Sequence, residues 1–326
     1  MTLRSLLAST ALALTLVGAP AVPVFAAPPV AYTQQADAYA MPLGDLEIVA
    51  LSDGTVPQNL YELLIGTHEA EIDGLLQHAF LANPVEASIN AFLVRGAGRI
   101  ILVDTGSGEL FGPGYGGKLV ASLAAAGVAP ADVTDVLITH VHTDHTGGLV
   151  AGGKPVFANA VVHVGAPDIN FFLDAANAER TGYAKQYFDE AAKTVGVYAA
   201  AGKVKSFADG EEILPGIVAT LHPGHTPGSA FFTVTSAGQS IVFVGDIVHV
   251  EAVQFPKPAI TILYDVDPAA AAAARQQAFP DLAGARQLIA APHLRFPGIG
   301  HVRAEDGGGF TWHPAEYRNR PGTAGE

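Results

Sequence analysis

Three imidazoles and one carboxylate fall within six consecutive residues of this chain. The cluster comprises His140, His142, Asp144 and His145, and it follows an apolar stretch, residues 133–139, that predicts a strand. Imidazole and carboxylate ligands without thiolate suit zinc, and also manganese, cobalt or iron. His140 and His142 share a side in extended geometry, whereas Asp144 and His145 lie beyond the turn. Because one cation is hard to surround with all four side chains, we expect the segment to supply ligands to two cations.

Three further candidate ligands, His225, Asp246 and His293, each follow an apolar segment and one or more small residues. Open α/β sheets collect functional side chains just beyond the carboxyl ends of their strands. We therefore expect these three side chains to converge on the histidine cluster. The strands that would deliver them are predicted at residues 217–221, 240–244 and 287–291.

The arrangement of predicted elements indicates stacked sheets. Strands at residues 88–94 and 99–103 flank a turn containing two glycines, which is typical of a hairpin. An earlier strand at residues 46–51 is expected to end at the turn Ser52-Asp53-Gly54. Hairpins followed by alternating strands and helices favour an α/β fold, a four-layered αββα sandwich. Helices are predicted at residues 118–126, 168–179, 183–200 and 269–279.

The N-terminal residues 1–26 are typical of a secretory signal peptide. Arg4 gives a positive start, residues 6–17 are apolar, and residues 24–26 fit a small-x-small cleavage rule. An uncleaved anchor is the alternative. No later segment approaches the roughly eighteen unbroken apolar residues of a membrane span, so we expect a soluble mature protein without a membrane partner. The predicted location is secreted and periplasmic.

The amino-acid composition limits the kinds of molecule that this chain is expected to bind. The 326 residues include no cysteine, so an exported form would have no disulfides and no thiolate ligand. The formal net charge is -14, which would repel nucleic acid from most of the surface. We therefore expect a small-molecule substrate that is neutral or weakly charged. Residues 27–44 are rich in alanine and proline and are expected to form an N-terminal arm before a single domain at residues 45–326.

The order of the candidate ligands resembles the signature of the metallo-β-lactamase superfamily: His140-x-His142-x-Asp144-His145, then His225, Asp246 and His293. Three other segments narrow the resemblance to the methyl parathion hydrolase family, which includes hydrolases of lactones and aryl esters such as dihydrocoumarin. The resemblance covers nearly the whole mature chain, roughly residues 41–312, and implies a catalytic domain of the metallo-β-lactamase fold. The three segments lie at residues 50–56, 110–113 and 293–301.

The resemblance implies a role for each ligand. One divalent cation would be held by His140, His142 and His225, and the other by Asp144, His145 and His293. Asp246 would bridge the two cations, and a hydroxide would be the second bridge. His301 is the rival of His293 for the last histidine position. We prefer His293 because it directly follows the apolar strand, and we place His301 near the site.

Two cations would solve the problem that water at neutral pH is a poor nucleophile. A water molecule shared between them has its pKa lowered towards about 7. The cations also polarise a carbonyl or phosphoryl oxygen and stabilise the developing oxyanion. Asp246 and Asp144 are the candidate catalytic carboxylates, and Asp144 could orient the hydroxide and pass its proton to the leaving group. The outer imidazole nitrogens need partners, for which Asp104, Thr139 and Thr226 are candidates.

Several aromatic residues and histidines are candidates for the substrate pocket. Phe111, Phe172 and Phe188 could line it, although the last two equally fit the buried face of amphipathic helices. His249 follows the bridging Asp246 by three residues and either faces the mouth of the site or is a buried structural histidine. The remaining histidines lack a motif and are treated as structural: His68, His78, His163, His222 and His313.

The leading hypothesis is a metal-dependent hydrolase of small esters, a lactonase or arylesterase. In the family, a histidine at the position of His249, with Ile262 and Tyr264 nearby, favours these substrates over organophosphate triesters, which stay as the alternative. A β-lactamase and glyoxalase II are disfavoured, the first because it commonly uses cysteine. A non-catalytic periplasmic metal-binding protein is the alternative of another class. Relatives in the family suggest a homodimer.

Overall fold

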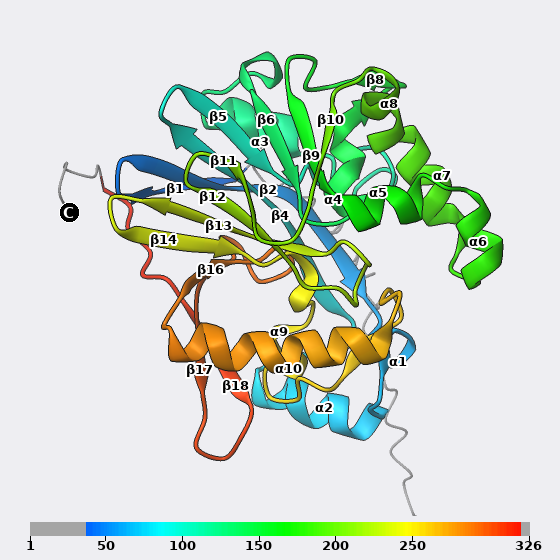
Figure 1. Ribbon diagram of the computed structural model, residues 1–326. Coiled ribbons are helices and arrows are strands. Elements are labelled where there is room, and N and C mark those ends of the chain that lie inside the picture. The colour runs from blue at the N-terminus through cyan, green and yellow to red at the C-terminus, as the bar shows by residue number, and fades with distance from the viewer. Residues whose placement is uncertain (1–36, 321–326) are drawn as a thin grey trace, which may run out of the picture. The chain divides into compact units, whose positions relative to one another are not determined.

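The computed structural model describes residues 37–320, which fold around two seven-stranded sheets (Figure 1). The first sheet is built from strands of the N-terminal two thirds of this region. In spatial order it contains β1 (Ala38–Leu43), β2 (Leu46–Gln58), β4 (Val85–Gly96), β5 (Arg99–Val103), β6 (Asp135–Ile138), β9 (Val161–Gly165) and β10 (Val204–Phe207). The last four of these strands are mutually parallel, so their carboxyl ends lie at one edge.

The second sheet consists of the strands that follow. In spatial order it contains β11 (Glu211–Leu214), β12 (Ile217–Leu221), β13 (Ala230–Ser236), β14 (Gln239–Phe243), β16 (Leu288–Ala290), β17 (Ile299–Ala304) and β18 (Phe310–Pro314). Strands β12 and β14 are each antiparallel to β13, and β14 is parallel to β16. Strands β12, β14 and β16 therefore point in the same direction.

Helices cover the outer face of each sheet (Figure 1). On the first sheet lie α3 (Leu119–Ala125), α5 (Ala166–Phe172), α6 (Ala176–Thr181), α7 (Lys185–Lys193) and α8 (Val195–Ala200). The second sheet is covered by the long helix α10 (Pro268–Gly284), which begins with Asp267 accepting a hydrogen bond from the backbone N–H of Ala270.

Short elements complete the chain around the strand ends. A small apolar cluster holds together α1 (Leu60–Leu63), β3 (Leu64–Ile65), α2 (Glu69–His78), α9 (Glu251–Gln254) and β15 (Thr261–Ile262). The remaining pieces are α4 (Thr143–Thr146), the hairpin of β7 (Val150–Ala151) and β8 (Lys154–Pro155), and three 3-10 turns, η1 (Pro130–Asp132), η2 (Gly147–Leu149) and η3 (Gly245–Ile247).

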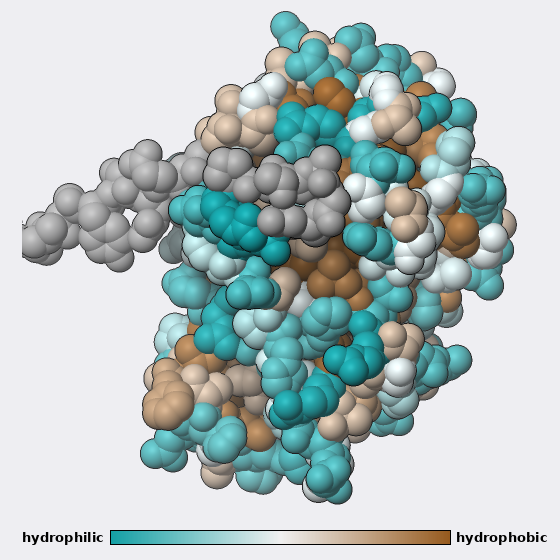
Figure 2. All heavy atoms as spheres, turned by 90° about the vertical axis from the view of Figure 1, so that its left-hand side faces the viewer, coloured by the Kyte–Doolittle hydropathy of each residue, from teal (hydrophilic) through white to brown (hydrophobic). Residues whose placement is uncertain are grey.

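The alternation of side chains along the strands produces the layers. In β2, Val49 faces the helices of the first sheet, whereas Ile48 and its alternate neighbours face the second sheet. In β13, Phe232 points between the sheets and Phe231 points towards α10. Three apolar layers thus separate helices, sheet, sheet and helix, and the four-layered αββα sandwich is confirmed. On the face in Figure 2, hydrophobic residues appear only in small groups among hydrophilic ones.

Two boundaries near the N-terminus differ from the sequence-based expectations. Residues 38–43, assigned to an N-terminal arm, form the edge strand β1, which pairs antiparallel with β2. The predicted turn Ser52-Asp53-Gly54 is instead a bulge inside β2, where the pairing with β4 shifts by one residue. The predicted signal peptide lies outside the described residues. Within residues 37–320, no helix combines the length and apolarity needed to cross a membrane.

The two helical segments after β9 are also each divided. The side chain of Asp174 accepts a hydrogen bond from the backbone N–H of Ala176, the first residue of α6, which is a separate helix after α5. Thr194 interrupts the second segment with non-helical backbone angles, φ -111° and ψ -87°, between α7 and α8. Its hydroxyl donates to the carbonyl oxygen of Glu190 and hydrogen-bonds Thr146 near the site. Local polar side chains, which compete with the helix for backbone groups, explain both breaks.

Candidate metal centre

The candidate ligands extend from strand ends of both sheets. The segment from His140 to His145 follows β6 of the first sheet. His225, Asp246 and His293 follow β12, β14 and β16, the strands of the second sheet that point the same way. The structure thus brings together all seven predicted ligands, and their side chains are buried except for Asp144, which is partly exposed.

A glycine before His225 shows why small residues precede a ligand. Gly224 has a φ of +145°, and a Cβ atom at this position would lie only 2.2 Å from the backbone nitrogen of Ala271 on α10. A larger residue would therefore push the loop away from the helix. The close approach sets the position from which the imidazole of His225 enters the site.

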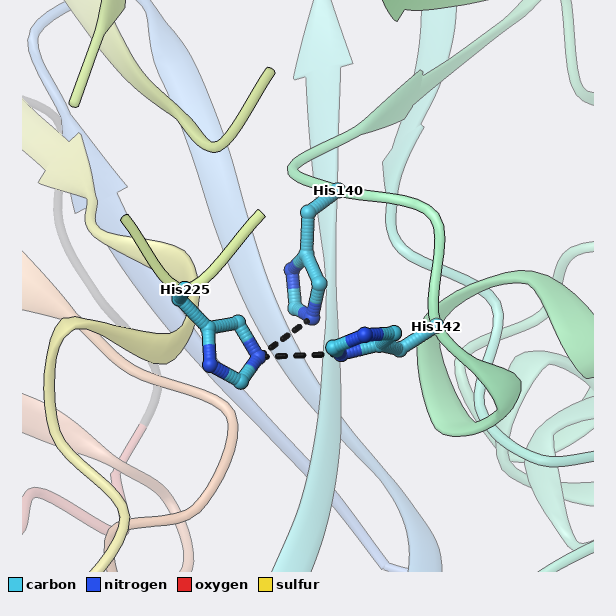
Figure 3. Close-up of side chains that lie close together, drawn as sticks. All are labelled: His140, His142 and His225. Atoms are coloured by element: carbon cyan, nitrogen blue, oxygen red, sulfur yellow. Dashed lines mark hydrogen bonds between the residues drawn. The ribbon is translucent and has the colours of Figure 1, made fainter. Parts of the chain in front are cut away.

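Three histidines form the first group of ligands (Figure 3). The Nε2 atom of His225 lies 3.1 Å from Nε2 of His140 and 3.0 Å from Nδ1 of His142. Figure 3 shows the three rings converging, with His140 and His142 coming from the same segment and His225 approaching from another segment, on the side opposite His142. Which of these nitrogens carries a proton is decided by the partner of the other nitrogen in each ring.

The outer nitrogens of His142 and His225 each have a partner that fixes the tautomer of the neutral ring. Tyr183 donates its hydroxyl proton to the carbonyl oxygen of Tyr264 over 2.8 Å, so its oxygen accepts from Nε2–H of His142 over 2.9 Å. His225 donates from Nδ1 to the carboxylate of Asp265 over 2.8 Å. In both neutral rings the inner nitrogen is therefore a lone pair that faces the centre of the group.

Asp104 fixes two more rings. Thr139 donates its hydroxyl proton to this carboxylate over 2.8 Å, so its oxygen accepts from Nδ1–H of His140 over 3.1 Å. The same carboxylate accepts from Nδ1–H of His145 over 2.9 Å. Asp104 has a φ of +58°, a left-handed conformation that is costly for a residue with a side chain. The surrounding hydrogen bonds hold this strained residue where it orients both imidazoles.

The last ring is fixed by the backbone. His293 donates from Nδ1 to the carbonyl oxygen of Ser88 on β4 over 2.8 Å, so its Nε2 also faces inward as a lone pair. Neutral imidazoles arranged in this way are metal ligands. In metal sites the outer ring nitrogen usually donates a hydrogen bond that fixes the orientation of the ring, as it does here. A divalent cation would accept these inward-facing nitrogens together. The donor set therefore fits divalent cations, zinc first and manganese, cobalt or iron with the same ligand types.

Asp246 lies between the two groups of ligands. Its Oδ1 is 3.3 Å from Nε2 of His145, and its Oδ2 is 3.3 Å from Nε2 of His225 and 3.0 Å from Nε2 of His293. Asp144 completes the second group, at 3.6 Å from His145 and 3.5 Å from His293. The carboxylate of Asp246 can therefore serve both groups of ligands, as the bridging role requires.

The electrostatics of the site follow from burial and from this crowding. Burial lowers the pKa of His140 and His142 well below the usual value. Burial opposes the charge of Asp246, but the facing histidines outweigh it and hold its pKa well below the usual range. Burial also opposes the charge of His225, but hydrogen bonds to Asp246 and Asp265 raise its pKa to about 9. A proton on His225 and a cation would compete for the same place, so cation binding displaces the proton.

A further histidine stands beside the predicted ligands. His249 has its Nε2 atom 3.1 Å from Oδ2 of Asp246, and it groups with Asp246 and His225. Burial lowers the pKa of His249 to about 4, so the ring is neutral at pH 7. Its Nδ1 atom is buried and has no hydrogen-bond partner among residues 37–320, whereas its Nε2 atom faces Asp246. His249 therefore has a polar atom to offer to a bound molecule.

A cavity of about 310 Å³ opens onto the ligands. Asp144, Asp246, His142 and His293 contribute to its floor, and none of the described lining residues is a lysine or arginine. Phe111 and His249 line it, as predicted for the substrate pocket. Its other walls come from Val56, Pro57, Gln58, Tyr115, Thr143, Gln186, Tyr187 and Tyr264.

Three residues predicted for the pocket lie elsewhere. Phe172 and Phe188 are 1% and 3% exposed in the core between the first sheet and its helices, where Phe172 also packs edge-on against the ring of His142. Both side chains therefore pack in the core as the buried face of amphipathic helices, and neither lines the cavity. His301 is exposed on β17 and hydrogen-bonds the carbonyl oxygen of Gln287. The turn after β16 directs His293 into the site, and β17 leads away from it.

The sequence analysis missed several residues that orient the ligands. Tyr183 and Asp265 were not predicted as partners of the histidines, whereas Asp104 and Thr139 were. The predicted candidate Thr226 donates instead to Asp168, a fully buried carboxylate that also accepts from the backbone N–H of Val141. Burial raises the pKa of Asp168 to about 6. Asp168 links the loop of His140 to the loop of His225 through these hydrogen bonds. In the sequence, only its position shortly after a predicted strand could have indicated this role.

Comparison with known proteins agrees with the fold described above. A family model described as the Metallo-beta-lactamase superfamily matches residues 85–280. The crystal structure of hydrolase AbOPH in the beta lactamase superfamily is 34% identical, with a TM-score of 0.83 over 88% of this chain and 100% of that chain. AidC, a dizinc quorum-quenching lactonase in complex with the product N-hexanoyl-L-homoserine, is 28% identical, with a TM-score of 0.78 over 87% of this chain and 99% of that chain.

Curated relatives match more limited regions. Ribonuclease TTHA0252 of Thermus thermophilus is 26% identical over 183 residues, which are 56% of this chain and 40% of the relative. Metallo-beta-lactamase domain-containing protein 1 of Mus musculus is 55% identical over 49 residues, which are 15% of this chain and 17% of the relative. This chain thus spans less than half the length of either relative. The family match extends over most of the sandwich, and the chain belongs to the metallo-beta-lactamase superfamily.

Proposed function

We propose that the protein is a metal-dependent hydrolase of small neutral esters, with lactones and aryl esters as its main substrates. One observation carries the proposal: five imidazoles and two carboxylates converge, and four of these seven side chains form the floor of an open cavity. A purely structural metal site is closed and has no need of such a cavity. The same observation disfavours a non-catalytic metal-binding protein.

The ligand set supports a pair of divalent cations, most readily zinc. When bound, the cations would acidify a water molecule and polarise the carbonyl group of the ester. The carboxylate of Asp144 is partly exposed to the cavity, so it can accept a proton from the attacking water and return it to the leaving alkoxide. His249 lines the cavity beside Asp246 as a neutral ring.

The cavity favours neutral substrates. Val56, Pro57, Phe111 and Tyr115 supply apolar and aromatic surface, and no lysine or arginine among the described lining residues would bind a carboxylate or phosphate. The similar structure of a quorum-quenching lactonase supports a lactone as the substrate. His249 at the cavity wall also favours lactones and aryl esters over organophosphate triesters. A nucleic-acid substrate, suggested by the relative named a ribonuclease, conflicts with the net charge of -14.

An assay panel tests the proposal. The purified protein is offered dihydrocoumarin, a phenyl ester, a paraoxon-type triester and nitrocefin, with and without a chelator. We expect hydrolysis of the lactone and the phenyl ester that the chelator abolishes and added zinc or manganese restores. Activity that resists the chelator, or no activity with two equivalents of metal bound, would contradict the proposal. A preference for the triester would reverse the order of substrates.

We also propose that the protein is exported to the periplasm and acts as a homodimer. The N-terminal sequence supports the first proposal, and the resemblance to the family supports the second. Cell fractionation with N-terminal sequencing of the mature protein tests export, and light scattering tests the dimer. A cytoplasmic full-length chain or a monomer at assay concentrations would contradict them.

A further inference from the structure

Helix α10 places a buried arginine beside the metal centre. Arg275 lies in the middle of this helix and is only 1% exposed. Arginine is almost never buried to this extent unless its charge is paired, because taking a charge out of water is costly. Here the guanidinium donates to three backbone carbonyl oxygens: from Nε to Ile247 over 2.7 Å, and from one Nη atom to Pro258 over 3.0 Å and to Ile260 over 2.8 Å.

The three carbonyl groups belong to two segments that carry parts of the site. Ile247 directly follows Asp246, the carboxylate that lies between the two groups of ligands. The other two carbonyl groups lie at the start of the segment that leads to Asp265, whose carboxylate accepts from Nδ1 of His225 over 2.8 Å. Burial lowers the pKa of the guanidinium, and the nearby charge of Asp265 opposes this shift. The guanidinium therefore links the turn of the bridging carboxylate to the segment that orients a histidine ligand.

The same helix also holds the loop of His225. Ala271 lies four residues before Arg275, so both side chains are on one face of α10. The close approach of Gly224 to Ala271 sets the loop of His225 against this face. Ala271 and Arg275 border the same small void as His225 and Asp246. Three segments that carry parts of the site therefore rest on one face of α10, and Arg275 makes the contacts with two of them.

A contribution to stability alone explains this arginine poorly. Replacing a buried ion with an apolar side chain of similar volume is often neutral or stabilising. Helix α10 is already attached to the second sheet by an apolar cluster that includes Ala278, Phe279 and Leu282. What a guanidinium adds is direction, because it is planar and its N–H groups point along fixed lines. Its three hydrogen bonds thus fix the positions of two segments relative to each other.

We infer that Arg275 is a positioning residue of the metal centre, which holds Asp246 and Asp265 where the two groups of ligands can meet around their cations. A guanidinium has no lone pair to offer a cation, so Arg275 acts through the backbone of the two segments. The inference rests on the proposed function, because it requires divalent cations at the centre. Loss of the link should let Asp246 and His225 move relative to each other and weaken cation binding.

Metal affinity tests the inference without any substrate. Arg275→Met removes all three hydrogen bonds, so zinc affinity in competition with a chromophoric chelator should fall about tenfold. Arg275→Lys keeps the charge but offers one nitrogen in place of the two that join the segments, so its affinity should also fall. Gln287→Met is the matched control, because the Nε2 atom of Gln287 donates to the carbonyl oxygens of Ser240 and Leu288 near the amino ends of β14 and β16, away from the ligands. The control should change zinc affinity by less than about twofold.

The visible spectrum of the cobalt-loaded protein provides a second readout. The absorption bands of cobalt(II) depend on the geometry of its ligands, which a loss of stability alone does not alter. At saturating cobalt, Arg275→Met should therefore change the positions or intensities of these bands. The spectrum of Gln287→Met should match that of the wild type even if its melting temperature falls.

Each outcome decides between positioning and stability. Wild-type zinc affinity and an unchanged cobalt spectrum in Arg275→Met would overturn the inference and leave the hydrolase proposal intact. If this variant does not fold, wild-type affinity in Arg275→Lys would overturn the inference, because the charge alone would then suffice. Failure of both variants to fold would assign Arg275 to stability and would overturn it as well. If the wild type binds fewer than two cations, the proposed metal centre and the inference fall together.

Discussion

The metal-ligating residues and the wall of the cavity beside them satisfy their polar groups in opposite ways. Every histidine of the predicted ligand set has its outer nitrogen engaged by a carboxylate, a hydroxyl or a backbone carbonyl. The buried atoms of the centre that lack a partner, Nε2 of His145 and Oδ1 of Asp246, face one another where a cation would bind, whereas in the wall Gln58 and His249 carry such atoms away from the group of ligands. The difference teaches that the centre is organised before a substrate arrives, whereas the wall keeps hydrogen-bonding capacity for one.

The orientation of the rings depends on contacts between distant parts of the chain. Two adjacent residues, Tyr264 and Asp265, orient two histidines: the carbonyl oxygen of Tyr264 through Tyr183, and the carboxylate of Asp265 directly. A single short segment after β15 therefore sets the rings of both His142 and His225. Substitutions of the residues that orient the histidine rings should therefore affect metal binding, and substitutions in the wall of the cavity should affect substrate binding.

The largest expected effect comes from Asp246→Asn, which removes the negative charge shared by both ligand groups. The amide keeps the shape but leaves His145, His225 and His293 without their common carboxylate. We expect fewer than two equivalents of bound metal and loss of measurable esterase activity. Metal content of the purified variant and kcat/KM on a phenyl ester measure the two effects.

Asp135→Asn is the matched control for a buried carboxylate. Asp135 pairs with His163 and Arg99 within the first sheet and contacts none of the candidate ligands among its hydrogen bonds. The control should lower the melting temperature without lowering the metal content. Full metal content and activity in Asp246→Asn would remove Asp246 from the centre.

The next largest effect is expected from Tyr183→Phe, which tests whether the outer hydrogen bonds matter. Phenylalanine cannot accept from Nε2–H of His142, so the ring can rotate or change tautomer. Loss of such a partner typically weakens metal affinity about 10- to 100-fold. A competition titration with a chromophoric chelator measures the affinity directly.

Tyr198→Phe is the control for a buried tyrosine hydroxyl. Tyr198 donates to the carbonyl oxygen of Leu149 and accepts from the backbone N–H of Phe157, so its loss costs about 1–3 kcal/mol of stability. Its metal affinity should equal that of the wild type. Equal metal affinity in Tyr183→Phe and the wild type would mean that the histidine rings do not depend on this hydrogen bond.

The sequence predicts the candidate ligands better than it predicts the residues that hydrogen-bond their outer nitrogens. The histidine cluster is local, and each distant ligand carries its own signal, an apolar strand followed by small residues. Asp265 and Tyr183 lack such a signal because they meet His225 and His142 across 40 and 41 positions of the chain. The four layers follow from alternating apolar residues, but the bulge at Asp53 depends on a distant loop that no local pattern reveals.

A smaller effect, confined to the wall, is expected from Asp53→Asn. The buried carboxylate of Asp53 accepts from the hydroxyl and backbone N–H of Ser107 and from the backbone N–H groups of Gly117 and Leu119. These bonds hold the glycine-rich loop that carries Phe111. Replacing one carboxylate oxygen with an amide N–H should cost about 1–3 kcal/mol of unfolding free energy. KM should rise while metal affinity stays constant.

Denaturant unfolding, KM and chelator competition on the same Asp53→Asn preparation separate these effects. Ser122→Ala is the control, because Ser122 on α3 donates to the carbonyl oxygen of Ser52 next to the bulge without contacting the loop through this hydroxyl. It should lower stability without raising KM. A fall in metal affinity in Asp53→Asn would show that the loop and the ligands are mechanically coupled, which would weaken the distinction between centre and wall.

The smallest effect is expected from His301→Ala. Its side chain is exposed on β17, and the hydrogen bond from this ring to the carbonyl oxygen of Gln287 lies on a surface where water can replace it. Loss of an exposed hydrogen bond of this kind changes stability by about 0.5 kcal/mol or less. Both kcat/KM on the phenyl ester and metal content should match the wild type, in contrast to His293→Ala, which removes a ligand candidate only eight positions earlier. A tenfold change in kcat/KM for His301→Ala would place this histidine in the working site, because the surface contact alone is too weak to produce one.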